Sequence, residues 1–87
     1  MGEYIWETTA EIDKALALRV KAIRKRKGYT QKELADKANV SYGSLKLFEQ
    51  TGDISLKSLT KIASELGIVG EIKQLFTQVP YMSLEEI

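Results

Sequence analysis

The 87-residue sequence predicts an all-α fold, a compact bundle of about five helices. Three helix starts share one pattern, in which a capping Thr or Ser lies between two apolar residues that can pack on each other. These caps with their apolar pairs are Thr30 with Tyr29 and Leu34, Ser41 with Val40 and Leu45, and Ser55 with Ile54 and Leu59. The single proline, Pro80, interrupts none of the predicted helices, and no segment alternates as a strand does. We therefore expect a single domain over residues 1–87, with its core at about 12–77.

The first helix is predicted from about Thr9 to Lys27. Thr8 and Glu11 can form a capping box at its start, and Gly28 ends it after a basic last turn. Apolar residues recur at three- and four-residue intervals, which predicts a stripe facing the core. The residues of this stripe are Ile12, Leu16, Val20 and Ile23.

The next two helices are short, and only the turn 39–41 separates them. Thr30 caps the first, with Glu33 completing a capping box, and Ser41 caps the second. The residues expected to face inward are Leu34, Ala35 and Ala38 in the first helix and Leu45 and Phe48 in the second. The two alanines allow the helices to approach closely. This arrangement predicts a helix-turn-helix, whose second helix can enter the DNA major groove.

A fourth helix begins after Ser55 and ends at Gly67. Its buried face is expected to contain Leu59, Ile62, Ala63 and Leu66. A fifth, short helix is predicted at about 70–77, carrying Ile72, Leu75 and Phe76. The residues from Gln78 onward form too short and mixed a segment to assign.

Composition argues against an enzyme. The sequence has no cysteine and no histidine, so it lacks the commonest metal ligand, the commonest general base and any disulfide. No glycine-rich phosphate loop and no nucleophile–base arrangement is present, and we expect no catalytic residue, no metal and no cofactor. The acidic N-terminus lacks an apolar run, and no segment approaches the roughly 20 apolar residues that span a bilayer. We expect a cytoplasmic protein with no membrane partner.

Positive charge is concentrated in one part of the chain. Between Arg19 and Lys46, nine Lys and Arg residues outnumber two acidic ones, a net charge of +7, whereas the segments on either side each carry −3. Phosphate contacts of a DNA-binding domain require positive charge beside the helix-turn-helix. The expected phosphate-facing residues are Arg24, Lys25, Lys27 and Lys32. A solvated basic helix face is the alternative interpretation.

The second helix of the pair supplies the candidate base contacts. Leu45 and Phe48 are expected to face inward. Helical spacing then places five residues on the outward face, namely Tyr42, Gly43, Lys46, Leu47 and Gln50. Tyr42 can stack or hydrogen-bond, Lys46 can reach guanine or a phosphate, and Leu47 can contact a thymine methyl or pack partly inward. Gly43 permits close approach, and Gln50 suits a phosphate. Gln31 and the capping Ser41 lie at helix starts, where an anion is favoured.

The segment from about Leu16 to Leu66 resembles the lambda-repressor/Cro (XRE) family of helix-turn-helix DNA-binding domains. The matching features include the basic run 24–28, Thr30-Gln31, Leu34-Ala35, Val40-Ser41, Glu49 and Ile62-Ala63. The resemblance implies that Gln31 supports the recognition helix and touches phosphate, and that Arg24 pairs with Glu49 as a structural device. The sequence departs from the family pattern at Gln50–Ser55, where the glycine comes one residue later than in many members and the usual proline is missing.

The resemblance implies a transcriptional regulator, a repressor, that binds a specific site on double-stranded DNA as a homodimer. The alternative is the antitoxin of a toxin–antitoxin pair, which binds a protein toxin and represses its own operon. This alternative rests on the chain ends, 1–8 and 78–87, which carry Tyr4-Ile5-Trp6 and Val79-Pro80-Tyr81-Met82 outside the family core. Such aromatic segments either form an interface or fold over the bundle.

Overall fold

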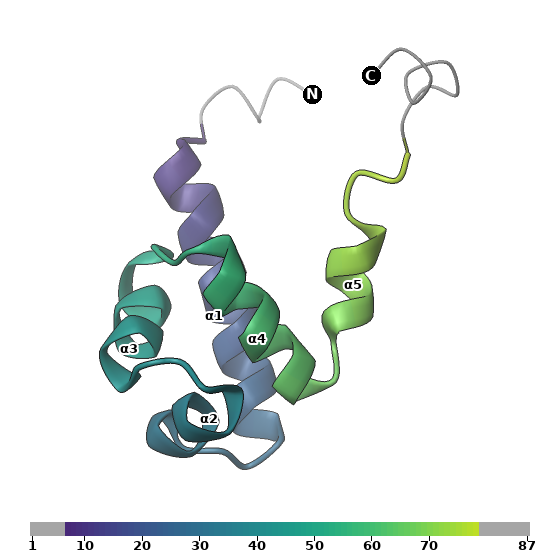
Figure 1. Cartoon of the computed structure of the whole chain (residues 1–87). Helices are drawn as coiled ribbons and strands as arrows, with labels where there is room; N and C mark the ends of the chain where they lie inside the picture. The colour runs from purple at the N-terminus through teal and green to yellow at the C-terminus, as the bar shows by residue number, and fades with distance from the viewer. Residues whose placement is uncertain (1–6, 79–87) are drawn as a thin grey trace.

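Five helices make up the fold of the computed structural model, which describes residues 7–78 (Figure 1). They are α1 (Thr9–Arg26), α2 (Gln31–Ala38), α3 (Tyr42–Thr51), α4 (Leu56–Leu66) and α5 (Val69–Gln74). No strand occurs within residues 7–78. The predicted all-α fold with five helices is therefore confirmed. The chain ends that were expected to form contacts lie almost entirely outside the described residues.

The caps place the helix starts where the sequence predicts them. Thr8 and Thr30 each accept a hydrogen bond from the backbone N–H three residues later, and Glu11 and Glu33 complete both capping boxes. Ser41 and Ser55 cap α3 and α4 in the same way, without the returning acid. Each cap satisfies a backbone N–H that has no partner within its own helix.

The core forms where α1 packs on α3 and where α2 packs on both α3 and α4. The largest fully buried side chains are Phe48, Leu34, Leu45, Ile62 and Leu66. Tyr29, Val40, Ile54 and Leu59 are partly buried against this cluster, as expected for apolar residues that flank caps. The inward faces predicted for α2, α3 and α4 are thus confirmed.

The prediction for the first half of α1 was wrong. Ile12 and Leu16 are 51% and 38% exposed, whereas Ala17 and Arg24 are buried beside Val20. The buried face of α1 is therefore rotated relative to the predicted stripe, toward α3. Leu16 lines an open groove shared with residues of α4 and α5, so it is only partly covered.

The fifth helix is also shorter than predicted, because it ends at Gln74. Leu75 is extended and Phe76 has a φ of 60°, so neither continues the helix, and they are 55% and 86% exposed. Contact with the bundle comes mainly through α4. In Figure 1, α5 stands beside α1 and points toward the same end of the molecule as the start of α1.

Candidate nucleic-acid interface

The turn between α2 and α3 is fixed by backbone hydrogen bonds. Asn39 adopts the left-handed conformation with φ 60°, and its N–H donates to the carbonyl of Asp36. The next N–H, of Val40, donates to the carbonyl of Ala35 at 3.0 Å. These two bonds form a Schellman motif, which satisfies the last carbonyls of α2 and turns the chain sharply. Ser41 then begins α3 directly, so the two helices form a rigid pair.

A buried ion pair holds α3 against α1. The Arg24 guanidinium donates from Nε to Glu49 Oε2 at 2.7 Å and from Nη2 to Glu49 Oε1 at 3.0 Å. Its Nη1 donates to the carbonyl of Tyr29 at 2.8 Å, and Gln31 Nε2 donates to Glu49 Oε1 at 2.8 Å. Residues of α1, α2 and α3 thus share one network. The pair that the resemblance implies is present, and Gln31 supports the recognition helix through Glu49.

One expectation for Arg24 was wrong. It was also expected to contact phosphate, but its side chain is buried and all three of its nitrogen atoms donate within the protein. A guanidinium committed to a buried carboxylate has no exposed edge for DNA. The sequence shows a basic run at 24–27, and only the folded structure reveals that its first member faces inward.

The outward face of α3 contains the residues of this helix that were predicted to contact bases or phosphate. Tyr42, Gly43, Lys46, Leu47 and Gln50 are all exposed, whereas Leu45, Phe48 and Glu49 on the opposite face are buried. The Nζ atoms of Lys32 and Lys46 each lie 5.7 Å from the centre of the Tyr42 ring. Two cations from two helices therefore meet at the N-terminal end of α3, the end whose side chains approach base edges in this kind of domain.

The serines at the start of α3 bond to each other. Ser41 Oγ accepts from the N–H of Ser44 and donates to Ser44 Oγ at 2.7 Å. The hydroxyl proton of Ser41 is thus already used, and Ser44 Oγ is the group left to donate outward. Sequence reasoning overlooked Ser44, although its position three residues after a capping serine was a usable signal.

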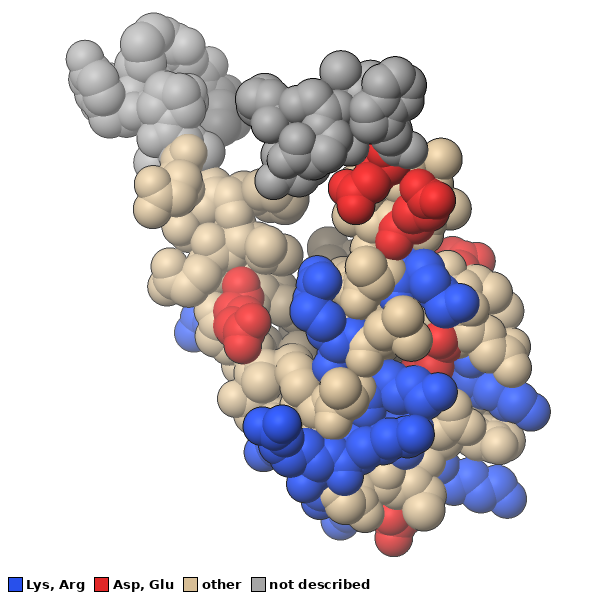
Figure 2. Space-filling model, turned by 180° about the vertical axis from the view of Figure 1, so that it is seen from behind, with Lys and Arg blue, Asp and Glu red and all other residues tan. Residues whose placement is uncertain are grey.

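The basic residues do not all lie on one face. Arg19 and Arg26 each follow a buried residue of α1 by two positions, which turns them by about 200° away from the side of α1 that packs on α3. Lys27 Nζ lies near Gly67 at the end of α4. Figure 2 shows the basic side chains spread over much of the rear face of the molecule, with acidic ones mostly toward its upper end. Lys25 on α1 and Lys32 on α2 are exposed.

A rigid helix pair whose second helix carries an exposed, partly cationic face defines the helix-turn-helix class of DNA-binding domains. A family model described as helix-turn-helix matches residues 20–71, more than half of the chain, and the chain belongs to this lambda-repressor-like (XRE) family. The family consists of DNA-binding regulators, so DNA is the partner that the fold implies. No curated protein matches the sequence. None of the helices within residues 7–78 is long and apolar enough to cross a membrane.

Proposed function

We propose that this protein binds a specific site on double-stranded DNA through α3 and represses transcription from the promoter that contains the site. The observation that carries the proposal is the exposed face of α3, where the ammonium groups of Lys32 and Lys46 each lie 5.7 Å from the centre of the Tyr42 ring. The buried pair of Arg24 and Glu49 supports it, because it fixes the direction of that face relative to the bundle. Repression follows when the occupied site overlaps the site of RNA polymerase.

The test is selection of bound duplexes from a random DNA pool, followed by affinity measurements on the selected site. Tyr42→Ala and Lys46→Ala are each expected to weaken binding to that site by at least about tenfold, the loss typical of a base contact. Lys73→Ala, an exposed lysine on α5, serves as the control and is expected to bind normally. Selection without any sequence preference, or normal binding by both α3 variants, contradicts the proposal.

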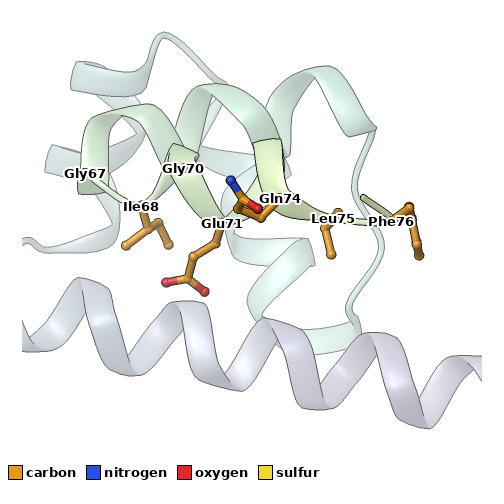
Figure 3. A pocket seen from close by; sticks show the side chains of 7 residues that line it. All are labelled: Gly67, Ile68, Gly70, Glu71, Gln74, Leu75 and Phe76. Carbon is orange, nitrogen blue, oxygen red and sulfur yellow. The ribbon is translucent and has the colours of Figure 1, made fainter. Parts of the chain in front are cut away.

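We further propose that the protein binds DNA as a homodimer through the groove between α1, α4 and α5. The groove is lined by Leu16, Val20, Leu59, Ile62, Ala63, Ile68, Ile72 and Leu75, with Arg19 and Glu71 as its charged residues. Figure 3 shows Ile68, Glu71 and Leu75 on the side of α5 that faces α1. Leu16 and Leu75, at 38% and 55% exposed, lose this exposure when a second copy covers the groove.

The charges in the groove favour a second copy of this chain as its occupant. Arg19 and Glu71 line the same groove but form no ion pair with each other within residues 7–78. In a two-fold dimer the same patch faces itself, so the arginine of each copy can pair with the glutamate of the other. A surface that carries a positive and a negative charge around an apolar centre is thus complementary to a second copy of itself.

Mixing two charge-reversed variants tests this dimer. Arg19→Glu and Glu71→Arg each place like charges opposite each other in a homodimer, and each is expected to shift the chain toward monomer in sedimentation measurements. A mixture of the two restores both pairs, so a heterodimer is expected. A monomeric mixture, or a dimer unaffected by either change, contradicts this interface.

The antitoxin function remains the second candidate, because the same apolar groove can accept a helix of a protein toxin. A monomeric native chain that forms a stoichiometric complex with the product of an adjacent gene through this groove supports that function. The Leu75→Asp variant tests whether the toxin binds in this groove, because the variant places a charge at an exposed apolar position of the groove.

A further inference from the structure

The outward face of α3 has few free hydrogen-bonding groups. Ser41 and Ser44 are bonded to each other, and Thr51 Oγ1 donates to the carbonyl of Leu47 and accepts from the N–H of Asp53. Gly43 has no side chain. Direct hydrogen bonding to bases therefore falls to the Ser44 hydroxyl proton and to Tyr42, Lys46 and Gln50, which is a small set for recognising a sequence.

Leu47 is the one large aliphatic side chain on this face. It is 46% exposed, whereas Leu45 and Phe48 on the same helix are fully buried, so the core does not account for a leucine at this position. Gly43 lies four residues earlier, one turn toward the N-terminus on the same face. Helical side chains lean toward the N-terminus, so Leu47 extends over the turn that contains Gly43.

Space is open at that turn. A methyl group built on Gly43 meets no atom within 4 Å, so a base edge can approach the helix closely at this position. This open position lies in the N-terminal half of α3, one turn before the exposed Leu47. In the major groove the one apolar group on a base edge is the C5-methyl of a pyrimidine. The exposed, apolar side chain of Leu47 matches this methyl group in polarity.

We propose that Leu47 recognises the C5-methyl group of a pyrimidine in the major groove, and that Gly43 provides the space for that base to approach. This inference rests on the proposed function, because it names the base feature that α3 reads. The methyl group can belong to thymine or to 5-methylcytosine. The two bases differ in their hydrogen-bonding groups but share this apolar one.

Removing one methyl group at a time from the DNA tests the proposal. Each thymine of the selected site is replaced in turn by deoxyuridine, which removes only the methyl group. At one position per half-site the native chain is expected to bind about fourfold more weakly, the effect of burying one methyl group. Leu47→Ala is expected to bind both duplexes equally, whereas Leu18→Ala, an exposed leucine on α1, is expected to keep the difference.

A second pair of duplexes distinguishes the two sources of the methyl group. At each cytosine of the site, 5-methylcytosine is compared with cytosine. A difference confined to this pair identifies methylated cytosine as the target, and a difference confined to thymine and deoxyuridine identifies thymine. If neither pair differs, or if the difference persists in Leu47→Ala, the inference is overturned. Failure of the proposed function itself is distinguishable, because selection then yields no preferred sequence.

Discussion

At the scale of single residues, the buried pair of Arg24 and Glu49 serves orientation more than stability. Every nitrogen of its guanidinium donates within the protein, and Gln31 adds a further bond to the carboxylate. Among the described residues, no buried side-chain nitrogen or oxygen lacks a partner. Desolvation of two charges offsets most of their attraction, so a well-packed apolar pair can be equally stable. What the ion pair adds is a fixed direction for α3.

A double-mutant cycle separates these two contributions. Glu49→Leu leaves the Arg24 charge buried without its partner, and the free energy of unfolding is expected to fall by about 3 kcal/mol. Adding Arg24→Met removes the unpaired charge and is expected to recover most of that loss in chemical denaturation. DNA affinity is expected to stay low in the double variant, since the orienting bonds are absent. Full recovery of affinity together with stability contradicts the orienting role.

At the scale of helices, the starts of α1 to α4 were predictable because each depends on side chains within a few residues. The caps Thr8, Thr30, Ser41 and Ser55 all act on a backbone N–H three residues later. Burial on α1 and the end of α5 were not predictable in the same way. They depend on how the helices pack on one another, and the sequence of one helix does not contain that information.

The inward position of Arg24 illustrates the same limit in the candidate site. The outward face of α3 follows from helical spacing, because Leu45 and Phe48 establish which side is buried. Arg24 differs, since its partner Glu49 lies 25 residues away and local sequence marks it only as part of a basic run. The pairing of Arg24 with Glu49 was predicted from the family resemblance, because the residues near Arg24 alone do not indicate it.

The end of α3 depends on close contact with α1. Gly52 has a φ of 87°, and a methyl group built there lies 2.6 Å from the backbone carbon of Asp13 and 2.7 Å from the nitrogen of Lys14. A larger residue therefore meets backbone atoms that cannot move aside. This contact explains why position 52 is a glycine.

Two glycines with similar backbone angles provide a matched comparison of this contact. Gly28 has a φ of 83° but open space around it, so Gly28→Ala is expected to cost about 1 kcal/mol from left-handed strain alone. Gly52→Ala adds overpacking against α1, and a loss of about 3 kcal/mol is expected. Chemical denaturation of both variants measures the difference. Equal losses for the two variants contradict a tight junction between α3 and α1.

At the scale of the whole molecule, the net charge of +1 conceals an uneven distribution. Basic residues occur around the helix-turn-helix, but helical geometry directs some of them elsewhere. Arg24 is buried, and Arg26 lies about 200° around α1 from the side that packs on α3. We therefore expect fewer phosphate contacts than the count of basic residues suggests. We expect Lys32 to be the clearest contributor, because its ammonium group lies beside Tyr42 at the start of α3.

The salt dependence of DNA binding measures this distribution directly. Each lysine that neutralises a phosphate releases counterions, so the slope of log affinity against log salt steepens by about 0.9 per contact. Lys32→Ala is expected to make the slope shallower by about that amount for each bound chain, and Lys32→Arg, which keeps the charge, to leave it nearly unchanged. Arg26→Ala is expected to leave the slope unchanged, because its side chain points away from α3. If Arg26→Ala flattens the slope as much as Lys32→Ala does, DNA contacts the rear face of α1 and the proposed docking through α3 is wrong.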